Sequence, residues 1–266
     1  ILKPDNPRLP GSVQNEALCM VLARRIGLNV APVTTGVAGG RSSLLVERYA
    51  RTGTGNNARR LHQEDFCQPL GRPPAAKYEF NGTGTRGPSI ADMFAVVRQH
   101  MTARDITRLL DAVIFNIAIG NVDSHAKNYS ILLGPSAPQL SPLYDLMSGL
   151  AWANITQNHA QAIGGQRRGR HIYGRHWRRM AEAAGLAARG TVQRVDQVTA
   201  RLLRELPEAV EKVSALPAGS SMLEIFATEI EERAVEVRTH AEQEGVPEVS
   251  GGVDEAPSLG GSAYGK

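Results

Sequence analysis

Two short segments, residues 120–130 and residues 142–145, constrain the fold of this chain more than any other part of its sequence. They read Gly-Asn-Val-Asp-Ser-His-Ala-Lys-Asn-Tyr-Ser and Pro-Leu-Tyr-Asp. Asp123 and Asn128 are five positions apart in the first segment, and Asp145 ends the second segment after a mostly apolar stretch. The fold is expected to bring these three polar side chains together.

The residues around these segments predict how the chain does so. A long apolar helix is expected over 106–119, immediately before the polar loop. Residues 129–133 then read as a strand, 134–138 as a Gly/Pro turn and 139–143 as a second strand. Such a hairpin returns the chain, and so it predicts that Asp145 lies beside the polar loop.

The spacing of these residues has a chemical interpretation. Asp-x-x-x-x-Asn is the spacing of the base and the metal-binding asparagine in the catalytic loop of protein kinases. Phosphoryl transfer needs a carboxylate that orients the attacking hydroxyl and oxygen ligands that hold magnesium on the phosphates. Asp123, Asn128 and Asp145 could supply these parts. Asp, Asn and His also favour surface turns, but the helix before the loop and the hairpin after it favour the chemical interpretation.

Further motifs agree in order and spacing with one known family. The chain resembles the HipA-like serine/threonine kinases of bacterial toxin–antitoxin systems over most of its length. The shared motifs are Ile-Leu-Lys-Pro (1–4), Asn-Glu-Ala-Leu-Cys (15–19), Leu-Val-Glu-Arg-Tyr (45–49), Leu-His-Gln-Glu-Asp-Phe-Cys-Gln (61–68), Lys-Tyr-Glu (77–79), the two segments above, Ala-Ile-Gly-Gly (162–165) and His-Trp (176–177). The resemblance implies a kinase that uses ATP and Mg²⁺.

The resemblance assigns roles to residues near the start of the chain. It implies that Lys3, on an apolar opening strand, contacts the α- and β-phosphates of ATP. Glu16 begins the next helix and could pair with Lys3, although an acidic residue in a first helical turn is equally explained by the helix dipole. Glu47, Arg48 and Tyr49 correspond to the hinge, whose backbone contacts adenine.

The polar loop receives the remaining roles. Asp123 is the expected base, or the residue that orients the substrate hydroxyl. His125 either contacts the γ-phosphate or braces the loop, and the structural role is slightly favoured. Lys127 is a candidate for neutralising phosphate charge. Asn128 and Asp145 are the expected magnesium ligands.

The expected fold class is α+β, a two-lobed protein-kinase-like fold. Residues 1–50 would form the remnant of an N-terminally truncated small lobe with the lysine strand, a helix and the hinge hairpin. Residues 51–244 would form a mainly helical catalytic lobe, and 245–266 a disordered acidic tail. In the family, a glycine-rich phosphate loop precedes the lysine strand. The chain begins at that strand, so it is expected to be a fragment and inactive as it stands.

Local patterns predict the individual elements. A helix is expected from Val13 to Ile26, a short helix over 62–70 and another over 146–153, whereas 154–169 is expected to be irregular. Ser89 and Thr102 are expected to cap the helices that follow them.

The apolar faces of three strand residues, Leu2, Leu44 and Val46, are expected to be exposed where upstream strands would cover them.

Neither cysteine belongs to a zinc motif, and both are expected to be buried free thiols in a cytoplasmic protein. No apolar run is long enough to cross a membrane.

Charge is unevenly distributed along the chain. The net charge is +4, and residues 241–266 carry five acidic side chains against one lysine, which leaves +8 on residues 1–240. A basic body suits an anionic partner such as a nucleotide, an acidic protein surface or nucleic acid, or it serves only solubility.

Two functions remain open from the sequence. The first is a serine/threonine kinase that acts as a toxin, is restrained by a DNA-binding antitoxin, and contacts nucleic acid only through that antitoxin. For this function the resemblance implies a protein substrate, with an aminoacyl-tRNA synthetase as an example. The second is a non-catalytic, kinase-like interaction module in an antitoxin–DNA repressor complex.

Overall fold

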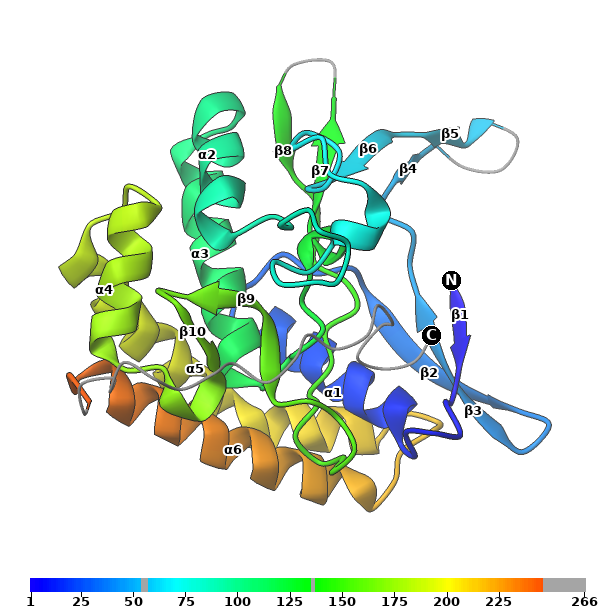
Figure 1. Cartoon of the computed structure of the whole chain (residues 1–266). Helices are drawn as coiled ribbons and strands as arrows, with labels where there is room; N and C mark the ends of the chain where they lie inside the picture. The colour runs from blue at the N-terminus through cyan, green and yellow to red at the C-terminus, as the bar shows by residue number, and fades with distance from the viewer. Residues whose placement is uncertain (54–56, 135–136, 246–266) are drawn as a thin grey trace.

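The computed structural model describes residues 1–53, 57–134 and 137–245, and it has a small antiparallel sheet on one side of a helical body (Figure 1). The sheet contains β1 (Leu2–Pro4), β2 (Val33–Ala38) and β3 (Arg41–Val46), in the order β1-β3-β2. Gly39 and Gly40 form the β2–β3 turn with positive φ angles of 57° and 73°, a conformation that costs glycine little. The predicted hairpin is therefore present.

The two faces of this sheet differ from the prediction. Leu44 and Val46 are buried, and only Leu2 of the three predicted residues is exposed, at 66%. Leu45, which the sequence analysis did not select, is 42% exposed. Side chains alternate along a strand, so Leu44 and Val46 share the face that packs against α1 and Leu45 points to the opposite face.

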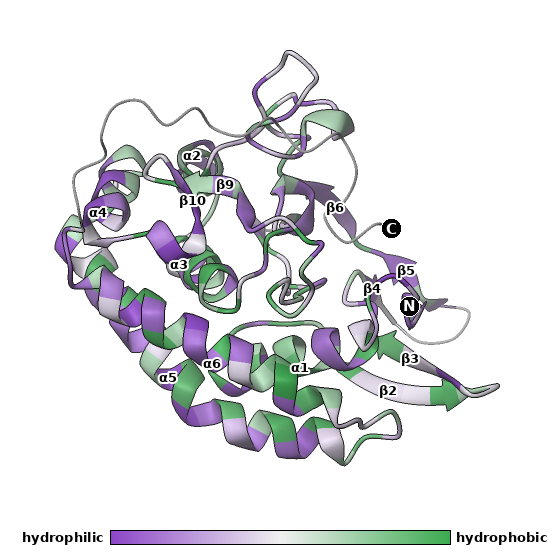
Figure 2. Ribbon diagram, turned by 60° about the horizontal axis from the view of Figure 1, so that its bottom comes forward, coloured by the Kyte–Doolittle hydropathy of each residue, from purple (hydrophilic) through white to green (hydrophobic). Residues whose placement is uncertain are grey.

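Helix α1 (Ser12–Arg25) lies between the sheet and two long helices, α5 (Ala188–Ser214) and α6 (Met222–Ala241). Twelve of the 14 residues of α1 are buried, because the helix is covered on both sides. Helices α5 and α6 run side by side along the base of the molecule (Figures 1 and 2). Hydrophilic and hydrophobic residues alternate along the ribbons of both helices in Figure 2.

The other helices are α2 (Ile90–His100), α3 (Ala103–Ala118) and α4 (Gly174–Ala183). Ser89 and Thr102 form capping boxes at the starts of α2 and α3, which confirms both predicted caps. The last ten residues of α3, 109–118, are all buried. This helix ends directly before the polar loop, and so it supports that loop from the core.

Short strands complete the fold. They are β4 (Arg51–Thr52), β5 (Arg59–Arg60), β6 (His62–Asp65), β7 (Ser130–Leu133), β8 (Pro138–Leu140), β9 (Asn158–Ile163) and β10 (Gln166–Arg168), with 3-10 turns η2 (Pro74–Ala76), η3 (Ala126–Asn128) and η4 (Gly169–His171). Strands β7 and β8 pair in antiparallel fashion, which confirms the predicted hairpin; residues 135 and 136 of its turn lie outside the described residues.

Three local predictions were wrong. The expected helix over 62–70 is β6 followed by a turn, because β6 pairs with β7. Residues 154–169 contain the β9–β10 hairpin. No helix forms over 146–153: Ser148 N donates to Asn15 Oδ1 and Gly149 N donates to Gly120 O, at 2.8 and 3.0 Å. Contacts with distant segments outweigh local preference over 62–70 and 146–153, whereas the β9–β10 hairpin pairs two adjacent segments.

The mixed composition of helices and strands agrees with the expected α+β class. The division of the chain at residues 50 and 244 stays a prediction, and residues 246–266 of the expected acidic tail lie outside the described residues. Within the described part of the chain, no helix combines the length and apolar character needed to span a bilayer.

Candidate active site

An ion-pair cluster joins three segments that are far apart in the sequence. Lys3 Nζ on β1 lies 2.5 Å from Glu16 Oε1 on α1 and 2.7 Å from Asp145 Oδ1. Burial disfavours the charged ammonium, but the carboxylates of Glu16 and Asp145 outweigh this effect and raise the pKa of Lys3 above its ordinary value. The expected Lys3–Glu16 pair is therefore present. The sequence analysis did not anticipate that Asp145 binds the same ammonium.

Backbone contacts hold the segment that carries Asp145. Leu143 forms an isolated parallel bridge with Val30. The Tyr144 hydroxyl donates to Lys127 O at 2.8 Å and lies 2.6 Å from Ser130 Oγ. These contacts bring the residue before Asp145 onto the end of the polar loop, as the predicted hairpin requires.

Asp145 has an unusual backbone conformation. Its φ of 58° makes it the single non-glycine residue with a positive φ among the described residues. A non-glycine residue with a positive φ has a strained backbone, and strain of this kind concentrates at functional sites. The ion pair with Lys3 helps to hold this conformation.

Buried amides shape the polar loop that follows α3. Asn121 Nδ2 donates to Asn116 Oδ1 at 2.8 Å, and Asn121 Oδ1 accepts from Asp123 N at 3.2 Å. Asn128 Nδ2 donates to Asp123 O at 2.8 Å and closes the loop. The sequence analysis missed Asn116 and Asn121 as supports. The signal that could have found Asn116 is its position in an otherwise apolar stretch of helix.

Asp123 is almost completely buried, with 1% of its surface exposed. The Tyr78 hydroxyl donates a hydrogen bond to Asp123 Oδ1. His125 Nε2 lies 4.0 Å from the same oxygen. Burial lowers the pKa of His125 to about 4, more than the Asp123 carboxylate raises it, so this imidazole is neutral near pH 7. Its buried Nδ1 has no hydrogen-bond partner among the described residues.

Lys127 has a carboxylate partner of its own. Its ammonium lies 2.5 Å from Asp65 Oδ2 at the end of β6. This ion pair ties the polar loop to the β6–β7–β8 sheet. The predicted role of Lys127 in neutralising phosphate charge stays a prediction.

A cleft of 710 Å³ lies between the small sheet and the segments that carry β4, β5 and β6. Its lining includes Lys3, the three predicted hinge residues Glu47, Arg48 and Tyr49, and Tyr144. The rings of Tyr49 and Tyr144 stack with their centroids 5.9 Å apart. The hinge segment, the lysine and the residue before Asp145 therefore share one cleft, which has room for a nucleotide.

The residues present fit a magnesium ion that is shared with phosphates. No group of three or more His, Cys, Asp and Glu side chains suited to a metal occurs in the part of the chain that the structure describes. Magnesium sites that hold nucleotides use one or two protein oxygens together with phosphate and water. Asn128 Nδ2 donates a hydrogen bond to Asp123 O, so Oδ1 of Asn128 is the amide atom that can face a cation. Asp145 adds a carboxylate.

The comparison with known families decides what kind of chain this is. The model of the HipA-like C-terminal domain matches residues 1–206. The chain belongs to this family. The matched residues include the lysine strand, the polar loop and the β7–β8 hairpin.

Curated relatives of the HipA-like chain carry the names of kinases. Y4mE of Sinorhizobium fredii is 39% identical over 241 residues, which are 90% of this chain and 56% of that protein. The serine/threonine-protein kinase toxin HipA of Shewanella oneidensis is 32% identical over 213 residues, 76% of this chain and 48% of that protein. The chain thus spans about half the length of these relatives.

Solved structures agree with the family. HipA in a complex with HipB and operator DNA, from the Shewanella oneidensis toxin–antitoxin system, superimposes with a TM-score of 0.79 at 26% identity; the match covers 90% of this chain and 60% of that one. The proinflammatory kinase CtkA of Helicobacter pylori has a TM-score of 0.63 at 12% identity, covering 90% and 85%. The second likeness concerns the fold alone.

Proposed function

We propose that this chain is the nucleotide-binding and catalytic region of a HipA-type serine/threonine protein kinase. One observation carries the proposal: Lys3 from the first strand binds both Glu16 and Asp145, and Tyr144, the residue before Asp145, bonds the loop that contains Asp123 and Asn128. A lysine between a helix glutamate and a metal-binding aspartate is the arrangement that positions ATP phosphates in protein kinases.

Most residues of the site have a part in binding ATP. Glu47, Arg48 and Tyr49 line the end of the cleft where adenine would bind, with Tyr144 beside the Tyr49 ring. Lys3 donates to the α- and β-phosphates. Asn128 and Asp145 would hold magnesium, which neutralises charge on the phosphates when it is bound.

Asp123 acts on the acceptor. It orients a serine or threonine hydroxyl of the substrate protein toward the γ-phosphorus. The hydroxyl oxygen forms a bond to that phosphorus as the bond to the bridging oxygen of ADP breaks. The hydroxyl proton passes to Asp123, and the electron pair of the broken bond leaves with ADP.

The reaction is tested with γ-labelled ATP, magnesium and dephosphorylated casein as acceptor protein, using the complete product of the gene. The unmodified protein is expected to label casein or itself. Asp145→Asn should lower the rate at least 100-fold, because the variant loses a charged metal ligand. Asp196→Asn is the matched control, because Asp196 is a half-exposed residue of α5 whose carboxylate pairs with Arg238. Equal rates for all three proteins would rule out the proposed site.

The partner is proposed to be a DNA-binding antitoxin, with nucleic acid bound through it. The support is the likeness to HipA, which was solved with HipB and operator DNA. Expression of the gene alone in bacteria should arrest growth, and expression of Asp145→Asn should not. Arrest by both proteins to the same degree would show that toxicity does not depend on the proposed chemistry.

A further inference from the structure

The segment Lys77–Glu79 crosses directly over the polar loop. Ala126 N donates to Lys77 O at 3.1 Å, which ties the backbone of the segment to the loop. At the next residue, the Tyr78 hydroxyl donates a hydrogen bond to Asp123 Oδ1. The Tyr78 ring packs edge-on against the His125 ring, with 5.2 Å between centroids and an interplanar angle of 84°. Tyr78 is 8% exposed and Asp123 is 1% exposed.

A carboxylate that is buried this deeply depends on its hydrogen-bond donors. Without donors, a charged carboxylate in a protein interior is unfavourable by several kcal/mol. The Tyr78 hydroxyl is a donor on a rigid ring, and the edge contact with His125 limits rotation of that ring. The contact therefore fixes the direction in which Asp123 points, and does so more firmly than water would.

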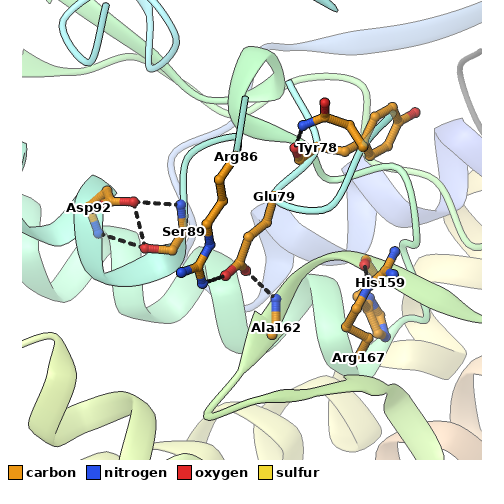
Figure 3. A network of polar contacts seen from close by, with 9 residues as sticks. Tyr78, Glu79, Arg86, Ser89, Asp92, His159, Ala162 and Arg167 are labelled. Atoms are coloured by element: carbon orange, nitrogen blue, oxygen red, sulfur yellow. Dashed lines mark hydrogen bonds and ion pairs between the residues drawn. The ribbon is translucent and has the colours of Figure 1, made fainter. Parts of the chain in front are cut away.

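The next residue, Glu79, anchors the segment from the other side. Glu79 is buried, its Oε2 accepts from Ala162 N at 2.8 Å, and its Oε1 accepts from Arg86 (Figure 3). Backbone hydrogen bonds also anchor Glu79: its N donates to Ala160 O at 3.0 Å, and its O accepts from Gly87 N at 3.1 Å.

Gly87 has a steric reason to be glycine. A Cβ at this position would lie 2.0 Å from Tyr78 O and 2.3 Å from Ala76 O. Residues 77–87 can therefore fold back on themselves only with glycine at this point. The close approach holds Tyr78 against the loop.

Strand β9 supports both the segment and the polar loop. Ala160 and Ala162 bind Glu79, while His159 Nδ1 lies 3.1 Å from Asn121 O, two residues before Asp123. A carbonyl only accepts, so His159 Nδ1 carries the proton in this contact. The Tyr78 segment and the loop are thus fixed to one strand, which sets the position of the hydroxyl relative to the carboxylate.

From these contacts we infer that Tyr78 is a positioning residue that aims Asp123 at the acceptor hydroxyl. Tyr78 is held in place by the next residue, Glu79, which bonds β9. This inference rests on the proposed kinase function. It assigns a role to a segment that lies 45 residues before Asp123 and outside the loop that carries the chemistry.

The test is Tyr78→Phe in the complete gene product, assayed with γ-labelled ATP, magnesium and dephosphorylated casein. This change removes only the hydroxyl and keeps the ring on His125. Misaimed catalytic groups typically lose about 10–100-fold in rate, so kcat should fall by that factor. The KM for ATP and the Kd for magnesium-ATP should stay within about twofold, because the hydroxyl contacts the base and not the nucleotide. Tyr173→Phe, at the start of α4, is the control.

A second variant tests the anchor. Glu79→Gln keeps an oxygen that can accept from Ala162 N but removes the charge that binds Arg86. It should lower kcat less than Tyr78→Phe does, with the same unchanged KM for ATP. A Tm within a few degrees of the parent's for each variant shows that the loss of kcat does not come from misfolding.

The outcomes separate the inference from the function on which it rests. A kcat unchanged in Tyr78→Phe would overturn the inference, and so would a faster rate, which would mean that Tyr78 blocks the base. A parallel change in KM for ATP and kcat would indicate general damage and would also overturn it. No transfer by the unmodified protein, or full transfer by Asp123→Asn, would instead contradict the proposed function.

Discussion

Lys3 and Asp145 are 142 positions apart in the sequence, yet Lys3 Nζ lies 2.7 Å from Asp145 Oδ1. This contact connects the first strand to the end of the β7–β8 hairpin. Because Glu16 binds the same ammonium, one lysine holds together the small sheet, the first helix and the segment after the polar loop. The arrangement of the cleft depends on it.

Lys3→Met should therefore affect both binding and stability. The variant removes the ammonium that separates the buried Glu16 carboxylate from Asp145, and breaking a buried ion pair in this way costs about 3–5 kcal/mol. Since Lys3 is 30% exposed, we expect a loss of about 2–3 kcal/mol in the free energy of unfolding. The affinity for magnesium-ATP should fall about 10–100-fold. Urea unfolding and calorimetric titration measure the two effects, with exposed Lys212→Met as control. Parent-like values in both would show that the cluster has neither role.

Asn121→Ala should disorder the polar loop without touching any proposed phosphate ligand. It removes the amide that bonds both Asn116 Oδ1 and Asp123 N in the core. Each unsatisfied buried group costs about 1–3 kcal/mol, so the free energy of unfolding should fall by about 2–4 kcal/mol. Asn29→Ala removes an exposed amide and is the matched control. If urea denaturation gives the same midpoint for both variants, the amide network does not support the loop.

Two buried histidines predict a loss of stability in acid. Burial lowers the pKa of His159 to about 3 and that of His125 to about 4. Both stay neutral in the folded chain, whereas the unfolded chain protonates them near pH 6.5. The folded state then binds fewer protons, so stability is full above pH 6.5 and falls as the pH decreases toward 4.

The slope of this loss is at most about 1.4 kcal/mol per pH unit for each histidine. Urea midpoints measured at pH 7.0, 5.5 and 4.5 test it. His159→Gln should flatten the dependence, and His62→Gln, at an exposed position, should not. A midpoint that stays constant from pH 7.0 to 5.5 would contradict the assignment of neutral, buried rings.

Neither thiol should react readily in the folded protein. Both cysteines are free and buried, as the sequence analysis predicted. Burial raises the pKa of Cys19 to about 12 and that of Cys67 to about 11, so almost no reactive thiolate exists at neutral pH. Labelling with a thiol reagent at pH 7.5 should be slow for both and complete within minutes in 6 M guanidinium, roughly the concentration that unfolds most domains. Fast labelling of a native thiol would show that its segment opens.

Local signals in the sequence predict the parts of the fold that local interactions determine. Ser89 and Thr102 precede helices because their side chains and a following aspartate satisfy the first backbone N–H groups. The β7–β8 hairpin follows from the strand-like residues 129–133, the Gly/Pro turn over 134–138 and the returning residues 139–143. This hairpin is sufficient to predict that Asp145 returns to the end of the polar loop.

Contacts between distant segments were not predictable in the same way. Strand β6 exists because β7 offers it a partner, and its own residues, His-Gln-Glu-Asp, do not suggest a strand. The Tyr78–Asp123 contact likewise joins segments 45 residues apart. No pattern in the sequence indicates that Tyr78 and Asp123 are partners, because this contact forms only when the fold has brought the two segments together.

The central claim is that Asp123 orients the acceptor hydroxyl and that the nucleotide binds independently of it. The most direct measurement compares Asp123→Asn with the parent, in the complete gene product, for transfer of labelled phosphate and for magnesium-ATP affinity. The account predicts that transfer falls at least 1000-fold, on the order of the loss expected for a general base, while the Kd for magnesium-ATP changes less than about threefold. Transfer at the parent rate, or loss of ATP binding together with transfer, would contradict it.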